Sequence, residues 1–145
     1  MRTFEDLLAN KNTVSKKELE LFFDQLEPIT PQELSGIWRG GFFPTGSLME
    51  FFISDFIIFK WYGKKFISKD NAKALLFSFF GIKLSIPIGN SFLKEINFKG
   101  KNSTSIIYKH LPIIDYLRKV NKNTLMGIME MNGKIKIYFY LQKNE

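Results

Sequence analysis

The chain contains no cysteine and only one histidine, His110, among its 145 residues. The absence of cysteine excludes disulfides, thiolate nucleophiles and thiolate metal sites. A single histidine excludes multi-histidine metal sites and cysteine–histidine nucleophile systems. The sequence also lacks a phosphate-binding loop, a nucleophile elbow and a paired-carboxylate signature. It therefore predicts no metal site and no bound cofactor, with haem ligated axially by His110 as an alternative.

Long apolar runs are also absent. The most apolar stretch, residues 48–62, is interrupted by three charged residues and is too short and too charged to span a bilayer. The N-terminus begins with charged residues rather than an apolar run, so we expect no secretory signal. Together with the lack of cysteine, these features predict a cytoplasmic protein without a membrane span.

Acidic residues are the minority, and the formal net charge is +7. The basic residues are mostly lysines scattered along the chain, and Lys16-Lys17 and Lys64-Lys65 are the only adjacent lysine pairs. Scattered lysines are typical of a solvated surface rather than of a nucleic-acid groove. We therefore expect no nucleic-acid partner, and the oligomeric state is not indicated.

Aromatic residues are abundant, at 16% of the chain, with 16 phenylalanines, five tyrosines and two tryptophans. One interpretation is an aromatic-rich core. The other is an aromatic-lined cavity of a few hundred cubic ångströms, which is how apolar ligands are usually held.

Two helical segments are predicted near the N-terminus. Residues 14–26 place apolar side chains on one helical face, and Ser15 with Glu18 forms a capping-box pattern. Thr30 and Glu33 flank Pro31 in a second start signal, and this helix must be short because Gly36 follows.

Short strands follow one another from Gly36 onward. We predict them at residues 37–43, 60–68, 74–80, 82–86, 93–98, 103–108, 116–120, 124–130 and 134–142. Residues 48–59 are ambiguous, and the spacing of their apolar residues favours a helix. The pattern predicts a mainly β fold, an up-and-down antiparallel barrel of about eight or nine strands with short N-terminal helices and one helix after the first strand.

The last hairpin has the clearest pattern. Asn132-Gly133 is a strong type I′ turn signal. In the strand after it, Ile135, Ile137 and Phe139 alternate with lysines and tyrosines, which predicts one dry face and one amphipathic face. We expect residues 1–35 to pack as a helical segment on a barrel of residues 36–145, forming one structural unit.

Several blocks carry a family resemblance. Gly36-Ile37-Trp38-Arg39-Gly40 fits the pattern GXWXG, and Phe43-Pro44-Thr45-Gly46 follows it. Residues 61–66, 107–115 and 120–130 resemble further blocks of the same bacterial GXWXG-domain family of unknown function. This family is distantly similar to lipocalin-like and nitrobindin-like barrels, which hold lipids or haem. The resemblance thus implies a ligand-holding barrel.

The chain departs from the family at two places. The family often has a histidine after Phe-Pro-Thr-Gly, where this chain has Ser47, and the segment 87–93 is shorter than in many members. An activity that needs the histidine is not expected here.

Nine residues are predicted to form the ligand-binding site: Trp38, Arg39, Phe43, Trp61, Tyr62, Tyr108, His110, Asp115 and Tyr138. Trp38 either closes one barrel end or lines the cavity. Arg39 is the candidate polar anchor for a ligand carboxylate or phosphate, or else pairs internally with Asp115 or Glu50. Strand alternation places Trp61 on one face and Tyr62 with Lys64 on the other, where a Tyr–Lys pair can polarise a ligand oxygen.

The leading hypothesis is an intracellular barrel that binds a small apolar molecule, such as a fatty acid or an isoprenoid. The first alternative is an isomerase, cyclase or hydrolase acting on such a ligand, with protons supplied by Tyr108, His110 and Asp115. The second alternative is a haem-binding barrel with His110 as the axial ligand.

Overall fold

The structure is a computed structural model that describes residues 2–45 and 60–143, apart from the side chains of Lys60 and Lys136. The predicted helix at 48–59 lies outside the described residues, as do Ser47 and Glu50. The remaining predicted elements can be compared with the structure.

Two α-helices and a 3₁₀ turn precede the first strand. Helix α1 (Phe4–Ala9) was not predicted from the sequence, and it begins with a full capping box between Thr3 and Asp6. Helix α2 (Lys16–Asp24) lies within the predicted helix, and the Ser15 hydroxyl accepts a hydrogen bond from the Glu18 backbone N–H. The Glu18 carboxylate, which a capping box would place as acceptor for the Ser15 backbone N–H, instead pairs with Arg2, which lies just before α1.

The second predicted helix is the 3₁₀ turn η1 (Pro31–Leu34). The Glu33 carboxylate accepts hydrogen bonds from the backbone N–H of Thr30, at 2.9 Å, and from its hydroxyl, at 3.0 Å. The element stays short because Gly36 adopts a φ of +97°, which ends the turn and starts the first strand.

The described residues that follow form nine antiparallel strands: β1 (Gly36–Phe43), β2 (Lys60–Ser68), β3 (Asn71–Phe79), β4 (Ile82–Ser85), β5 (Asn90–Phe98), β6 (Lys101–Tyr108), β7 (Ile113–Asn121), β8 (Thr124–Met131) and β9 (Lys134–Gln142). A second 3₁₀ turn, η2 (Pro87–Gly89), separates β4 from β5. Each strand lies within a few residues of its predicted range.

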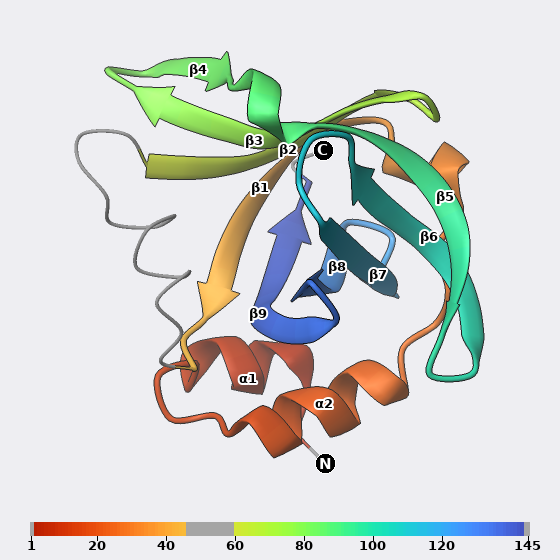
Figure 1. Cartoon of the computed structure of the whole chain (residues 1–145). Coiled ribbons are helices and arrows are strands. Elements are labelled where there is room, and N and C mark those ends of the chain that lie inside the picture. Colours follow the sequence, from red (N-terminus) through yellow and green to blue (C-terminus); the bar gives the residue numbers. More distant parts are fainter. Residues whose placement is uncertain (1, 46–59, 144–145) are drawn as a thin grey trace.

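Eight of these strands close into a barrel. The sheet order is β2-β1-β9-β8-β7-β6-β5-β3-β4, and β2 also pairs with β3, so the ring closes with β4 as an extra strand beside β3. Figure 1 shows the ring of strands with α1 and α2 packed below β1 and β9, while the β3–β4 hairpin projects on the opposite side. The predicted up-and-down antiparallel barrel is confirmed.

The Asn132-Gly133 turn joins β8 to β9 as predicted. Both residues have positive φ, 51° for Asn132 and 81° for Gly133, which is the requirement of a type I′ turn. The alternation predicted for β9 holds only in part, because the register shifts opposite Met129 and Glu130. Ile137 and Phe139 face the interior, but Ile135 lies before the shift and is 39% exposed.

The sheet buries apolar side chains on both of its faces. The inner cluster fills the barrel and includes Trp38, Leu117 and Phe139. The outer cluster packs Tyr138 and its neighbours on β1, β7 and β8 against Phe4 and Phe23 of the helices. Tyr138, on the other face of β9, is buried because the N-terminal helices cover it, whereas Lys134 at the start of the strand is exposed.

Candidate functional site

The barrel interior contains a lysine, and irregular strand pairing places it there. Trp61 and Lys64 are both buried in the interior although they are three residues apart. The pairing of β2 with β3 shifts register between Trp61 and Gly63, and again between Gly63 and Lys65. These shifts break the simple alternation that predicted opposite faces for the two side chains.

Lys64 binds three acceptors inside the barrel. Its Nζ lies 2.9 Å from Asp115 Oδ2, and it donates to the Tyr108 hydroxyl at 3.1 Å and to the backbone carbonyl of Ala74 at 3.2 Å. Two of the three N–H donors of the ammonium group are thus used in hydrogen bonds, and its charge is paired with Asp115. The aromatic rings of Trp61 and Phe139 lie 5.4 and 5.2 Å from Nζ, within cation–π range.

Tyr108 and Asp115 complete a cluster of polar groups that is closed to solvent. The Tyr108 hydroxyl donates to Asp115 Oδ2 at 3.2 Å, and both side chains are almost fully buried. Burial raises the pKa of Tyr108 well above its ordinary value, and the charge of Asp115 and the hydrogen bond to it act in the same direction. Tyr108 therefore keeps its proton and acts as a hydrogen-bond donor.

One polar atom of this cluster has no partner. Asp115 Oδ1 is buried, and no hydrogen-bond donor in the described part of the chain reaches it. A buried carboxylate oxygen without a donor is costly, so it marks where a further group would bind.

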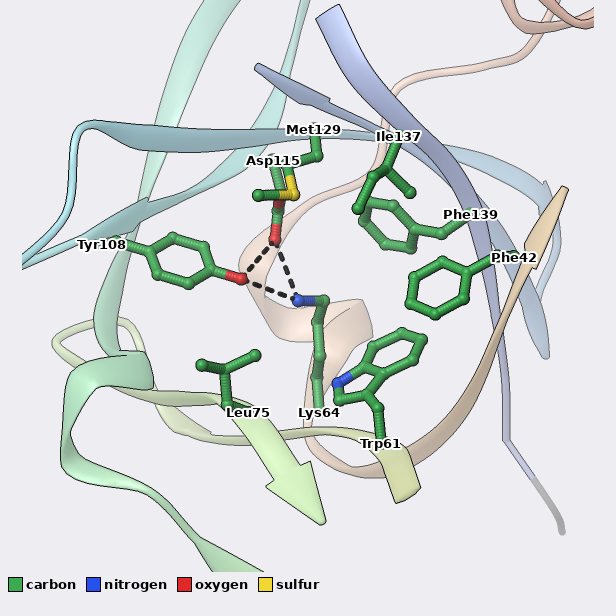
Figure 2. Close-up of a pocket in the computed structure, with 9 residues that line it drawn as sticks. All are labelled: Phe42, Trp61, Lys64, Leu75, Tyr108, Asp115, Met129, Ile137 and Phe139. Carbon is green, nitrogen blue, oxygen red and sulfur yellow. Dashed lines mark hydrogen bonds and ion pairs between the residues drawn. The ribbon is translucent and has the colours of Figure 1, made fainter. Parts of the chain in front are cut away.

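A small cavity adjoins the polar cluster. Figure 2 shows its wall, in which Lys64, Tyr108 and Asp115 converge from β2, β6 and β7. The other lining residues are apolar or aromatic: Phe42, Trp61, Leu75, Met129, Ile137 and Phe139. The ring of Trp61 stacks on that of Phe42 at 4.8 Å and meets that of Phe139 edge-on at 6.3 Å.

The cavity bounded by these residues measures about 20 Å³. That volume holds a group the size of one water molecule, for which about 10–15 Å³ is the minimum. It is far smaller than the few hundred cubic ångströms expected for an apolar ligand held entirely inside. The expectation of a roomy cavity is not met within the described residues.

A larger hollow of about 200 Å³ lies between α1 and α2. Its polar side chains, Arg2 and Glu18, are paired with each other. It offers no unpaired polar group, so the barrel interior remains the better candidate.

The two glycines of the GXWXG segment serve this interior in different ways. Gly36 supplies the positive φ that begins β1. Gly40 has an ordinary φ, but a Cβ atom there would collide with the Trp61 ring. Trp38 lies between them, fully buried, and its indole N–H donates to the Leu34 carbonyl at 2.9 Å. Trp38 therefore closes the barrel against η1 and does not line the cavity.

Three of the predicted site residues meet in the cavity, namely Trp61, Tyr108 and Asp115. Others lie elsewhere because alternation turns them outward. Arg39 is exposed on the outer face of β1, so Lys64, and not Arg39, is the interior cation that pairs with Asp115. Phe43 and Tyr138 pair across β1 and β9 in the outer cluster beneath the helices.

Tyr62 and His110 also lie away from the cavity. The Tyr62 ring packs under Lys83 Nζ at 4.5 Å, so the Tyr–Lys partnership predicted with Lys64 is formed by Tyr108 instead. His110 is exposed in the connection between β6 and β7. The proposed proton-supplying set of Tyr108, His110 and Asp115 is therefore not assembled in one pocket.

Sequence reasoning missed several lining residues: Phe42, Leu75, Met129, Ile137 and Phe139. Nothing distinguishes them in the sequence from ordinary core residues. The available signal was Gly63 between Tyr62 and Lys64, because an interior glycine often marks a bulge.

In residues 2–45 and 60–143, no three histidine or carboxylate side chains gather as a metal site would require. No helix in these ranges is long and apolar enough to cross a membrane.

Comparisons with known proteins agree with the fold. Residues 21–79 match the family described as GXWXG protein, and residues 89–143 match the domain of unknown function DUF4334. A crystal structure of a protein from Thermomonospora curvata is similar over 97% of this chain and 95% of that chain, with 31% sequence identity and a TM-score of 0.84. No curated protein matches the sequence.

Proposed function

This chain belongs to the GXWXG protein family, and from that premise we propose that its barrel binds a small apolar molecule against Lys64, Tyr108 and Asp115. The observation that carries the proposal is the convergence of these three side chains from three strands onto one aromatic-walled cavity. An apolar pocket with a few convergent polar groups is the usual form of a small-molecule site.

The energetics of the buried pair support a binding role. Desolvating an ammonium and a carboxylate is expensive, and apolar residues of similar volume often give equal or greater stability. Lys64 and Asp115 are 4% and 1% exposed, so both bear this cost in full. A ligand that uses the cluster accounts for polar groups that the fold itself does not require.

The volume of the cavity limits how the ligand is held. About 20 Å³ accommodates one small polar group and not a whole apolar molecule. Phe42 and Leu75 are the lining residues that keep partial solvent exposure, so the apolar part of the ligand would run past them.

Three probes with the same ten-carbon isoprenoid tail test the proposal: geraniol, geranyl methyl ether and geranate. Trp61 lines the cavity, so saturable quenching of tryptophan fluorescence reports binding. Leu75→Phe fills the cavity wall and should weaken binding by about tenfold or more. Leu84→Phe makes the same change on the exposed strand β4 and should leave binding unchanged. Absence of saturable quenching by all three probes, or equal affinities in Leu75→Phe and the unmodified protein, would refute the proposal.

A further inference from the structure

We infer that the cavity selects a ligand whose polar end is an uncharged hydrogen-bond donor, namely an alcohol or phenol hydroxyl, in preference to a carboxylate. This inference rests on the proposed function and specifies the chemistry of its ligand. It follows from which hydrogen-bond donors and acceptors of Lys64, Tyr108 and Asp115 already have partners.

The donors of the cluster have partners inside the protein. Lys64 donates hydrogen bonds to Tyr108 and Ala74 and forms an ion pair with Asp115. The Tyr108 hydroxyl gives its proton to Asp115 Oδ2. A ligand carboxylate or phosphate would therefore have to compete with Asp115 for the Lys64 ammonium group, and the Tyr108 hydroxyl offers it no free proton.

The acceptor side is incomplete. Asp115 Oδ1 is buried and receives no hydrogen bond from the described residues, although the side chain lines the cavity. A ligand that donates a hydrogen bond to this oxygen removes the cost of leaving it unsatisfied. Only a donor group gains this energy, and an ether or ester oxygen does not.

Charge and size further restrict which donor group the cavity accepts. Lys64 already neutralises Asp115, so a ligand ammonium would add a second positive charge within the same apolar cavity. A ligand carboxylate would instead place a second negative charge beside Asp115. A hydroxyl is neutral and about the size of a water molecule, which fits a volume of about 20 Å³.

The three probes share the same tail, so differences between their affinities report on their polar ends. In the unmodified protein, geraniol should bind about tenfold or more tightly than geranyl methyl ether, and geranate should bind most weakly. Equal affinity for alcohol and ether, or tightest binding of geranate, would overturn the inference while leaving the proposed function intact. If none of the three binds, the proposed function fails.

Two isosteric variants test whether Asp115 causes the preference for alcohol over ether. Asp115→Asn should reduce the preference for alcohol over ether to less than about threefold, because the acceptor loses its charge. Glu130→Gln is the matched control, since Glu130 also accepts a hydrogen bond from a tyrosine, Tyr116 at 2.8 Å, but through an outer-face pair. An unchanged preference in Asp115→Asn would overturn the assignment to Asp115. If that variant does not fold, the probe series in the unmodified protein decides alone.

Discussion

At the scale of the residue, the most consequential side chain is Lys64. Its side chain is 4% exposed, and it is held by one carboxylate, one phenol and one carbonyl, with aromatic rings around its ammonium group. A neutral replacement would leave Asp115 charged in an apolar cavity. The Lys64–Asp115 pair therefore acts as a unit whose halves cannot be removed separately without cost.

Lys64→Met tests this dependence. It should lower the free energy of unfolding by about 3–5 kcal/mol, because the Asp115 charge loses its partner. The double variant Lys64→Met with Asp115→Leu should recover most of that loss. Urea denaturation, monitored by circular dichroism, measures the free energy of unfolding of both variants.

The control for Lys64 is another lysine that lies over an aromatic ring. Lys83 covers Tyr62 from the exposed strand β4, so Lys83→Met should cost less than about 1 kcal/mol. Equal losses in Lys64→Met and Lys83→Met would show that burial of the pair is not what matters.

At the scale of the element, the first two strands shape the cavity together. Strand β1 carries Gly40, which leaves room for the Trp61 ring of β2. Strand β2 carries the register shifts that turn both Trp61 and Lys64 inward. The position of the lysine thus depends on pairing across strands.

Gly40→Ala tests the fit between these strands. The added methyl group has no backbone penalty, since Gly40 has an ordinary φ, but it collides with the Trp61 ring. We expect a loss of about 1–3 kcal/mol from overpacking and a shift of the tryptophan emission.

A double-mutant cycle identifies the cause. Trp61→Phe should cost less in the Gly40→Ala background than alone, because the smaller ring makes room for the methyl group. Strictly additive losses would contradict the steric explanation.

At the scale of the whole molecule, one sheet supports two apolar layers. Strands β7, β8 and β9 contribute to the barrel core on one face and to the helix-covered cluster on the other. Arg118 of β7 ties helix α2 to the sheet, donating to the carbonyl of Phe23 at the end of α2, at 3.0 Å, and to that of Phe98 on β5, at 2.6 Å. The segment between α2 and β1 is also tied to the barrel, since Ile29 exchanges hydrogen bonds with Ser103 and Thr104.

These links predict that residues 1–35 unfold together with the barrel as one structural unit. Both tryptophans are buried in the barrel, so their fluorescence reports its unfolding, while circular dichroism at 222 nm also reports the helices. The two urea transitions should coincide. Arg118→Met should lower both midpoints equally, and an earlier loss of the helical signal would show that the helical segment is a separate unit.

Alkaline pH should destabilise the fold. Burial raises the pKa of Tyr108 well above 10, and burial with the hydrogen bond to Glu130 raises the pKa of Tyr116 to about 12. In the unfolded chain these phenols lose their protons near pH 10, so above that pH the folded state holds more protons and its stability falls.

The measurement is the free energy of unfolding between pH 9 and 11. In Tyr108→Phe the free energy of unfolding should decline less steeply with pH, and the slope should differ by about the amount that one titrating proton contributes. The same alkaline slope in Tyr108→Phe and the unmodified protein would contradict the prediction.

The sequence by itself determined the succession of short strands along the chain and the class of fold. Turn signals such as Asn132-Gly133 and the short apolar strands act locally, so the antiparallel barrel could be predicted from them. Helix α1 was not predicted because six residues are too few to show a helical spacing of apolar side chains. The exposed Ile135 was missed because a register shift is a property of two strands.

Only the tertiary structure decided which polar groups meet. Trp61, Tyr108 and Asp115 were predicted for the site, and the structure brings them together around Lys64. Arg39 and His110 looked equally suited in sequence, but side-chain alternation along β1 and the connection between β6 and β7 place them at the surface. The sequence states which residue types are present, whereas the burial of a charged side chain depends on which strands pair and where their register shifts.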